Sequence, residues 1–196
     1  MADNLTEFPI TTKKVSELSA ASTLSGTETI NTIQSLINKK ATVAQIYTYV
    51  QTQMKGIAQY YMNNNATATT INTQDVFVKA AGTTSEGISA VNFTVSTNKA
   101  LYSLNTSANY RVTAMLTASS GNNETIKARI ALNGTTQARS EQKIETDGAG
   151  DAHQIVIEDI VTLSADTDYI EIFVANGSST TNITVIDLHV IIEKLH

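Results

Sequence analysis

From residue 73 to the end of the chain, apolar and polar residues alternate with a period of two. In residues 110–117 the apolar positions are Tyr110, Val112, Ala114 and Leu116. Three further runs repeat the pattern, with apolar positions at Ile126, Ala128, Ile130 and Leu132, at Ile170, Ile172 and Val174, and at Ile186, Leu188, Val190 and Ile192. Such alternation is typical of antiparallel strands that bury one face.

Turn signals separate these runs at Gly121-Asn122-Asn123, Asn133-Gly134, Gly148-Ala149-Gly150 and Asn176-Gly177. Asn-Gly pairs accept positive φ and therefore favour tight hairpins. Eight or more short strands in about 120 residues are typical of a two-sheet sandwich. The pattern predicts an antiparallel jelly-roll domain over residues 73–196, in a protein that is mainly β.

The pattern upstream has a helical period instead. Thr42 and Gln45 have the spacing of a capping box, in which each side chain bonds the other's backbone N–H. An apolar stripe with spacings of three and four follows, at Val43, Ile46, Val50, Met54, Ile57 and Tyr61. This predicts a helix over residues 42–62, followed by a polar linker over residues 63–72.

The stripe repeats every eleven residues, which suits a straight or slightly right-handed helical bundle. Because it is narrow and flanked by polar residues, we expect identical helices to associate. The alternative is a single helix packed on its own domain.

Residues 1–41 hold few apolar positions, too few for an independent core. We expect this module to need a partner surface or copies of itself, and disorder is the alternative.

Composition supports the β assignment and excludes several classes of protein. The chain has 30 Thr, 16 Ser and 16 Asn, which suit strand faces and turns, and only 16% charged residues. Cys is absent, which excludes disulfides and thiol chemistry. No apolar run predicts membrane insertion, and the N-terminus lacks the basic and apolar stretches of a secretory signal. The net charge of −5 argues against a nucleic-acid partner.

No set of residues predicts an active site. Asp147 and Asp151 flank a glycine turn but lack the alternating acidic ligands of a calcium loop. Asp166 and Asp168 have the spacing of residues that shape a turn. His153 and His189 form no close metal-binding pair. We therefore expect no enzyme, no catalytic or metal-ligating residues and no cofactor.

Three short motifs in residues 11–46 carry a family resemblance. They are Lys13-Lys14-Val15-Ser16-Glu17-Leu18, then Leu24-Ser25-Gly26-Thr27-Glu28, then Lys39-Lys40-Ala41-Thr42-Val43-Ala44-Gln45-Ile46. Their order resembles the N-terminal segment of many tailed-bacteriophage structural proteins, although Ser19 stands where that family often has Pro. The resemblance implies location in the virion and attachment to capsid, neck or tail proteins, with candidate attachment residues Lys13, Val15, Leu18, Leu24 and Glu28.

The C-terminal domain is similar to the trimeric jelly rolls of the tumour-necrosis-factor and complement-head type. The likeness lies in Tyr110-Arg111-Val112, in residues 161–170 and in the last strand, which ends at Leu195. It implies a homotrimer. Besides the helical stripe, we expect four large residues at the trimer interface: Phe77, Tyr102, Phe173 and Ile191.

The leading functional hypothesis is a non-enzymatic structural component of a phage virion, a trimeric head fibre or tail-associated appendage. The alternative is a host-glycan-binding module that uses loops 119–124, 133–136, 146–152 and 176–182, although these loops contain no aromatic residue for sugar stacking. A depolymerase would need paired carboxylates in a cleft, and so short a chain with small loops offers little room for one.

If the helical stripe aligns the chains, then Ile46→Asp combined with Ile57→Asp should weaken the trimer, because it places carboxylates in an apolar contact. Sedimentation of the double variant measures the effect. An unchanged trimer would show that the stripe is not the assembly element.

Overall fold

The computed structural model describes residues 29–34, 37–42, 45–46, 50 and 56–195. The chain divides into two units, Met1–Gln51 and Thr52–His196. In the first unit, β1 (Thr29–Gln34) and β2 (Ile37–Thr42) form an antiparallel hairpin in which Gln34 lies opposite Ile37. An isolated two-stranded sheet is marginally stable at best. The predicted attachment residues Lys13, Val15, Leu18, Leu24 and Glu28 lie outside the described residues.

The predicted capping box is confirmed at the end of this hairpin. The Thr42 N–H donates to Gln45 Oε1 at 2.9 Å, and the Gln45 N–H donates to Thr42 Oγ1 at 3.1 Å. Gln45, Ile46 and Val50 are helical. The other residues of the predicted helix before Gly56, which are 43–44, 47–49 and 51–55, lie outside the described residues.

The helix does not extend to residue 62, and this part of the prediction is wrong. Residues Ile57–Met62 form strand β3, in which Ala58, Tyr60 and Met62 are buried. Gly56 disfavours a helix just before this point, and β3 pairs with the last strand of the chain, with Ile57 opposite Glu193 and Met62 opposite Leu188. These backbone pairs and the burial of alternate side chains outweigh the local helical spacing.

Residues 63–72, predicted as a linker, are part of the same domain. They include β4 (Ala68–Thr69), and both Thr69 and Ile71 are buried. The Asn65 side chain donates to Val185 O at 2.8 Å and to Ala81 O at 3.1 Å. Single buried residues leave no periodic signal, so the sequence pattern missed this segment.

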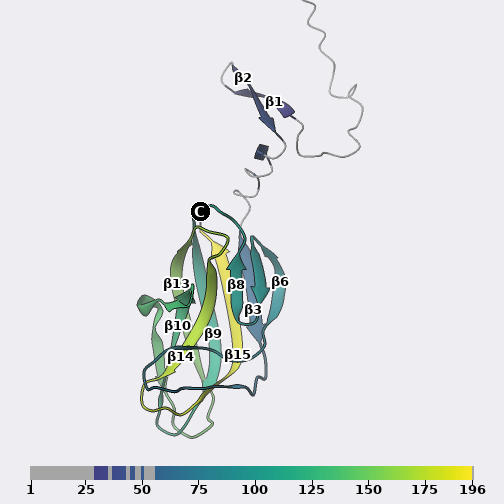
Figure 1. Cartoon of the computed structure of the whole chain (residues 1–196). Helices are drawn as coiled ribbons and strands as arrows, with labels where there is room; N and C mark the ends of the chain where they lie inside the picture. The colour runs from purple at the N-terminus through teal and green to yellow at the C-terminus, as the bar shows by residue number, and fades with distance from the viewer. Residues whose placement is uncertain (1–28, 35–36, 43–44, 47–49, 51–55, 196) are drawn as a thin grey trace, which may run out of the picture. The chain divides into compact units, whose positions relative to one another are not determined.

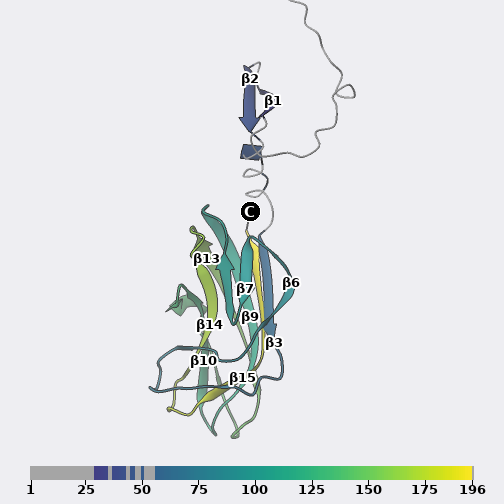
Figure 2. The ribbon, with the colours of Figure 1, turned by 45° about the vertical axis from the view of Figure 1, so that its right-hand side comes forward.

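Two antiparallel sheets pack face to face, as Figure 2 shows. The first, here called the β9 sheet, has the order β13 (His153–Leu163), β9 (Ala108–Ser119), β15 (Ile183–Lys194), β3, β6 (Ser85–Val91), and β4 pairs with β15. The second, the β10 sheet, has the order β11 (Thr135–Thr136), β10 (Thr125–Leu132), β14 (Tyr169–Asn176), β8 (Lys99–Tyr102), β7 (Phe93–Ser96). In addition β12 (Gln142–Glu145) pairs with β10, and β5 (Val78–Lys79) pairs with β14. A short 3-10 helix, η2, spans Ala138–Ser140.

The core lies between the two sheets and contains most of the predicted inward residues. Their buried members are Tyr110, Val112, Ala114, Leu116, Ile126, Ala128, Ile130, Ile170, Ile172, Val174, Leu188, Val190 and Ile192. Leu132 is only half-buried. Ile186 does not enter the core, because the register of β15 shifts between Val185 and Asp187. Ile183 and Val185 are buried instead, since a bulge reverses the side-chain alternation.

The abundant Asn residues supply left-handed backbone at turns. Among the described residues, every non-Gly residue with positive φ is Asn or Asp. The β10–β11 turn uses Asn133 at φ 53° and Gly134 at φ 75°, as the Asn-Gly pair predicts. The composition is thus partly a consequence of the number of tight connections.

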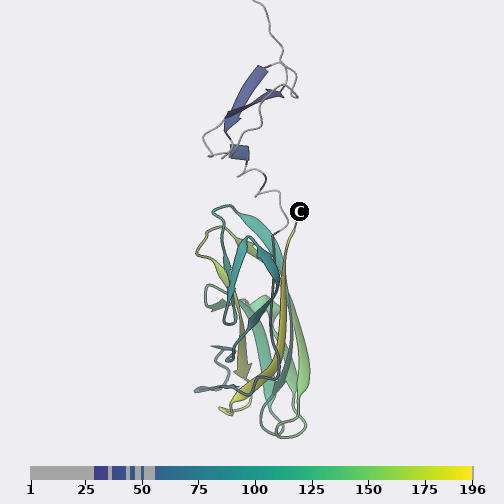
Figure 3. The same cartoon turned by 90° about the vertical axis from the view of Figure 1, so that its right-hand side faces the viewer.

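The chain enters the sandwich at the end where it also finishes. The Lys194 N–H donates to Gly56 O at 2.9 Å. The hairpin loops at the opposite end lie far from the C-terminus in Figures 1 and 3. A Cβ added at Gly56 would lie 2.7 Å from the Tyr110 hydroxyl oxygen. The tight contact explains why only glycine fits at the start of β3.

Gly56→Ala should lower the free energy of unfolding by about 1–3 kcal/mol, because the Tyr110 ring is held by Phe93 and Tyr102 and cannot move aside freely. Urea denaturation measures it. Gly148→Ala is the matched control, since its new methyl group meets only the mobile end of exposed Asp151. Equal stabilities for both variants would contradict this account of Gly56.

Candidate interaction surface

Apolar side chains line up across the outer face of the β9 sheet, the face turned away from the core. One cross-strand row places Val156 opposite Met115, Met115 opposite His189, and His189 opposite Tyr61. The next row consists of Glu158, Thr113, Ile191, Gln59 and Ile88, and a third of Ile160, Arg111, Glu193, Ile57 and Val91. Five of the six strands of the β9 sheet, all but β4, contribute to these rows.

Several of these residues are strongly exposed. Val156, Ile160 and Ile88 have 50%, 49% and 43% of their surface accessible, and Met115, Ile191 and Tyr61 are half-buried. Exposed apolar side chains interspersed with polar ones, as on this face, have the mixed composition of a protein interaction surface.

The same face carries both signs of charge. Arg111 Nε lies 3.8 Å from Glu158 Oε1, and Arg111 stands opposite Glu193. Beside His189 lies a hollow of about 210 Å³, lined by Asn63, Met115, Leu116, Thr117, Gln154, Asp187, Leu188 and His189. The surface therefore offers apolar contact, a concavity and paired charges, which together suit another protein surface.

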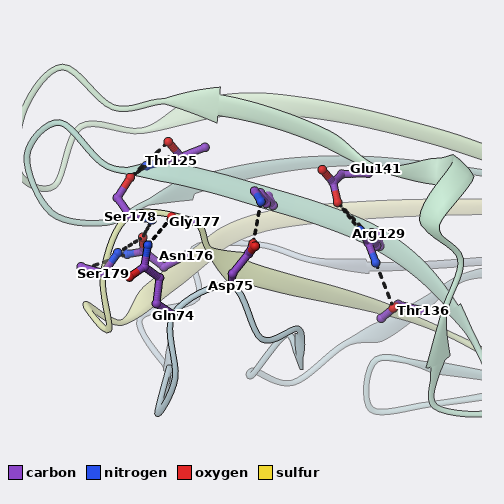
Figure 4. Close-up of polar contacts among 11 residues, drawn as sticks. Gln74, Asp75, Thr125, Arg129, Thr136, Glu141, Asn176, Gly177, Ser178 and Ser179 are labelled. Carbon is purple, nitrogen blue, oxygen red and sulfur yellow. Dashed lines mark hydrogen bonds and ion pairs between the residues drawn. The ribbon is translucent and has the colours of Figure 1, made fainter.

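The outer face of the β10 sheet is covered by the chain itself. Asp75 forms an ion pair with Lys127, in which Oδ1 lies 2.5 Å from Nζ. The Arg129 guanidinium lies over the Phe77 ring, with its central carbon 4.2 Å from the ring centroid. Figure 4 shows the surrounding contacts, including Arg129 with Glu141 and Thr136, and Gln74 with Gly177.

Three further observations support this difference between the two outer faces. Lys79 bonds Glu171 at 2.8 Å, and Lys99 lies over the Tyr169 ring at 3.7 Å. Ala131 and Ala175 lie in the same cross-strand rows as Glu171 and Lys127, and both are fully buried. The segment from Asp75 to Lys79 thus closes this face, whereas no described segment covers the outer face of the β9 sheet.

The residues predicted for the trimer interface do not share one surface. Ile57, Tyr61 and Ile191 lie together on the outer face of the β9 sheet. Phe77 and Phe173 lie on the β10 side. Of the helical positions, Ile46 is half-buried and Val50 is 47% exposed, and Val43 and Met54 lie outside the described residues.

The prediction for Tyr102 is wrong. Tyr102 is 1% exposed within a single chain, with its ring 5.5 Å from both Phe93 and Tyr110. Its hydroxyl donates to Thr106 O at 2.9 Å. Strand β8 has apolar residues on both of its faces, with Ala100 and Tyr102 on one and Leu101 on the other. The sequence therefore did not indicate which of the two faces is buried.

Sequence reasoning missed Met115, His189, Val156, Ile160 and Ile88 as members of the surface. The signal was present in residues 153–163, where Ile155, Ile157, Val161 and Leu163 occupy one parity and Val156 and Ile160 the other. Apolar residues at both parities indicate a strand that is covered on both faces.

Three of the four loops predicted for glycan binding meet at one end of the sandwich, around buried Glu124. The Glu124 carboxylate accepts from Ser179 Oγ at 2.6 Å, from Ser120 Oγ at 3.0 Å and from the Asn176 amide. The Glu124 N–H donates to Thr146 Oγ1 at 3.0 Å. Burial raises the pKa of Glu124, but the hydrogen bonds from Ser179, Asn176, Thr181 and Ser120 outweigh it and hold the pKa below its ordinary value.

The fourth loop, 133–136, lies at the other end, since it follows the opposite end of β10. There Asp168 Oδ2 accepts from the N–H groups of Ser164 at 2.7 Å and Ala165 at 3.0 Å, which confirms the predicted turn role of Asp168. Asn133 donates to Asp168 Oδ1 at 2.8 Å. The Ser164 N–H bond, followed by the bonds from Asn133 and Ala165, outweighs burial and lowers the pKa of Asp168.

The core buries Tyr60 and Tyr110, and the β9 sheet carries His153 and His189. Burial raises the pKa of Tyr60 and Tyr110 far above the ordinary value, so that both hydroxyls stay protonated. His153 lies opposite core-facing Ala118, whereas His189 lies on the outer face, so the two face opposite sides of the sheet. Among the described residues no group of three His, Asp or Glu side chains is placed to hold a metal ion, and no helix has the length and apolarity to cross a membrane.

Comparison with solved structures identifies the fold. Murine APRIL superposes with a TM-score of 0.50 at 7% identity, covering 72% of this chain and all of APRIL. Eiger TNF from S. frugiperda gives 0.43 at 12% identity, over 72% and 94% of the two chains, and PRD1 vertex protein P5 gives 0.36 at 12%, over 72% and 97%. No protein-family model and no curated protein matches the sequence. The sandwich is a tumour-necrosis-factor-like jelly roll, as the strand pattern predicts.

Glu124→Gln should lower stability at neutral pH by about 1–2 kcal/mol, because one acceptor oxygen among these donors is lost. The unfolded chain takes up the Glu124 proton at a higher pH than the folded chain does. This contribution is therefore complete above the ordinary pKa of 4.5 and is lost as pH falls through the folded pKa.

Urea denaturation at neutral and acid pH measures both effects, with exposed Glu145→Gln as the control. The two glutamine variants should differ at neutral pH and converge in acid. A difference that persists unchanged in acid would contradict the assignment to the Glu124 carboxylate.

Proposed function

We propose that this chain is a non-enzymatic structural component of a phage virion, a trimeric head fibre or tail-associated appendage that displays a jelly-roll domain. The observation that carries the trimer is the outer face of the β9 sheet. It is the apolar sheet face that the described chain leaves uncovered, and two further copies are its occupants.

Charge supports copies of this chain as the partner. The outer face of the β9 sheet carries Arg111 together with Glu158 and Glu193. When identical surfaces meet around a threefold axis, each copy presents a different part of its face to its neighbour, so cations and carboxylates of one face can pair between copies. The resemblance to trimeric jelly rolls favours the same assembly.

The arrangement of the domain suits a molecule attached at one end. The chain enters at Gly56, beside the C-terminal end of β15, and the three loops joined by Glu124 lie at the opposite end. The N-terminal resemblance to phage structural proteins supports attachment to the particle by residues 1–41. The hairpin of β1 and β2 is too small to be stable alone, so assembly in several copies or against a particle would stabilise it.

Val156→Asp should convert the trimer to monomers, because it places a carboxylate in the apolar contact and weakens each subunit contact by about 1–3 kcal/mol. Sedimentation equilibrium of the full chain measures it. Val76→Asp is the matched control, since Val76 is also 50% exposed but precedes Phe77 on the β10 side. A monomeric parent chain, or a Val156→Asp variant that remains trimeric, would refute this interface.

The helix and the sheet face are separable contributors to assembly. Ile46 is helical and Ile57 lies in β3, so the double substitution tests two elements at once. Ile46→Asp alone addresses the helix.

A further inference from the structure

Two Asn-Gly pairs occur in this chain, Asn133-Gly134 after β10 and Asn176-Gly177 at the end of β14. An Asn that precedes Gly is prone to deamidation, because Gly has no side chain to shield its backbone nitrogen from the Asn Cγ. That nitrogen attacks Cγ, the bond from Cγ to Nδ2 breaks, and the backbone N–H proton leaves with the amide nitrogen as ammonia. Water then opens the cyclic imide to Asp or isoaspartate.

The fold blocks this reaction at Asn176. The residue is 0% exposed, and its Oδ1 accepts from the Ser178 N–H at 2.9 Å. The attacking nitrogen is occupied as well, since the Gly177 N–H donates to Thr125 O at 2.8 Å. Deamidation at this position would require the loops joined by Glu124 to open together.

The same pair at Asn133 is accessible. Asn133 and Gly134 are both exposed at the tip of the β10–β11 hairpin. Among the described residues no acceptor takes the Gly134 N–H. The Asn133 side chain makes two hydrogen bonds, from Nδ2 to Asp168 Oδ1 at 2.8 Å and from the Tyr169 N–H to Oδ1 at 2.9 Å. Because this tip is a two-residue surface loop, both bonds can break without exposing the core.

Deamidation of Asn133 would replace a hydrogen-bond donor by a second carboxylate. The orientation of the amide is fixed, because the Tyr169 N–H can only donate and the Asp168 carboxylate accepts. In the product an oxygen stands where Nδ2 now lies, 2.8 Å from Asp168 Oδ1. Two carboxylates ionised near neutral pH repel each other at this distance. The repulsion acts on the turn before β14, which Asp168 closes by accepting from the N–H groups of Ser164 and Ala165.

We infer that Asn133 is a site of spontaneous deamidation in the folded protein, and that the carboxylate formed there opens the turn that Asp168 closes. The reaction takes place within a single chain and consumes only water, so it does not depend on assembly. No ion pair within the described part of the chain reaches Asp168 to offset the added charge.

Peptide mapping by mass spectrometry of the full chain, after storage in mildly alkaline buffer, tests the site. Trypsin releases residues 130–139, in which Asn133 is the only Asn, and residues 144–194, which contain Asn176. In the folded chain Asn133 should deamidate at least about tenfold faster than Asn176, because the buried site opens only at a larger free energy. In urea, where both pairs are unfolded, the two rates should converge. Equal rates in the folded chain, or no reaction at Asn133 while the urea-treated chain reacts, overturn the assignment.

Asn133→Asp tests the consequence directly. It should lower the midpoint of urea denaturation, and its effect should largely disappear in an Asp168→Asn background, where only one carboxylate remains. Asn72→Asp is the matched control, because it places the same charge on another exposed loop residue. Circular dichroism verifies that each variant is folded. An Asn133→Asp midpoint equal to that of Asn72→Asp, or an equal effect of Asn133→Asp in both backgrounds, overturns the repulsion from Asp168.

Discussion

The organisation of this protein depends on how its two sheets cover their four faces. The two inner faces bury each other and form the core. The outer face of the β10 sheet is covered from within the chain, because Asp75, Phe77 and Lys79 bring counterions and an aromatic ring onto Lys127, Arg129 and Glu171. No described segment covers the outer face of the β9 sheet, although Val156 and Ile160 are apolar. The proposals on assembly follow from this asymmetry.

Hydrogen-bonded carboxylates order loops at the two ends of the domain, buried Glu124 at one end and half-buried Asp168 at the other. Glu124 joins three loops at one end through hydroxyl and amide donors. Asp168 closes the turn before β14 at the other. In both cases hydrogen bonds to a carboxylate order loops that contain few apolar residues. The donors are uncharged hydroxyl, amide and backbone N–H groups, and no cationic side chain is needed. This use of Ser, Thr and Asn is consistent with the low charge of the chain.

The outermost strand of the β9 sheet must also be kept from pairing with the strands of other molecules. β13 is an edge strand of eleven residues, and a free edge of that length can pair with other chains. At Ile160 both backbone groups are occupied: the N–H donates to Asp159 Oδ1 at 2.8 Å, and the carbonyl accepts from Arg139 at 2.7 Å. Arg139 in turn pairs with Asp159 at 2.5 Å.

The sequence by itself determined the strand alternation, the inward residues of β9, β10 and β14, the Asn-Gly hairpin and the capping box at Thr42, because each depends on neighbours in the chain. It also predicted the jelly-roll class. Tertiary structure determined that residues 57–62 form a strand, because pairing with β15 overrides their helical spacing. It also determined the bulge after Val185, which turns Ile186 away from the core. In β14, Phe173 alternates with the inward residues Ile170, Ile172 and Val174, so the sequence already placed it on the outer face. In β8, Ala100 and Tyr102 share one face and Leu101 lies on the other, so the period of two fixed which residues share a face but not which face is buried. The position of the second sheet decided that Tyr102 lies in the core.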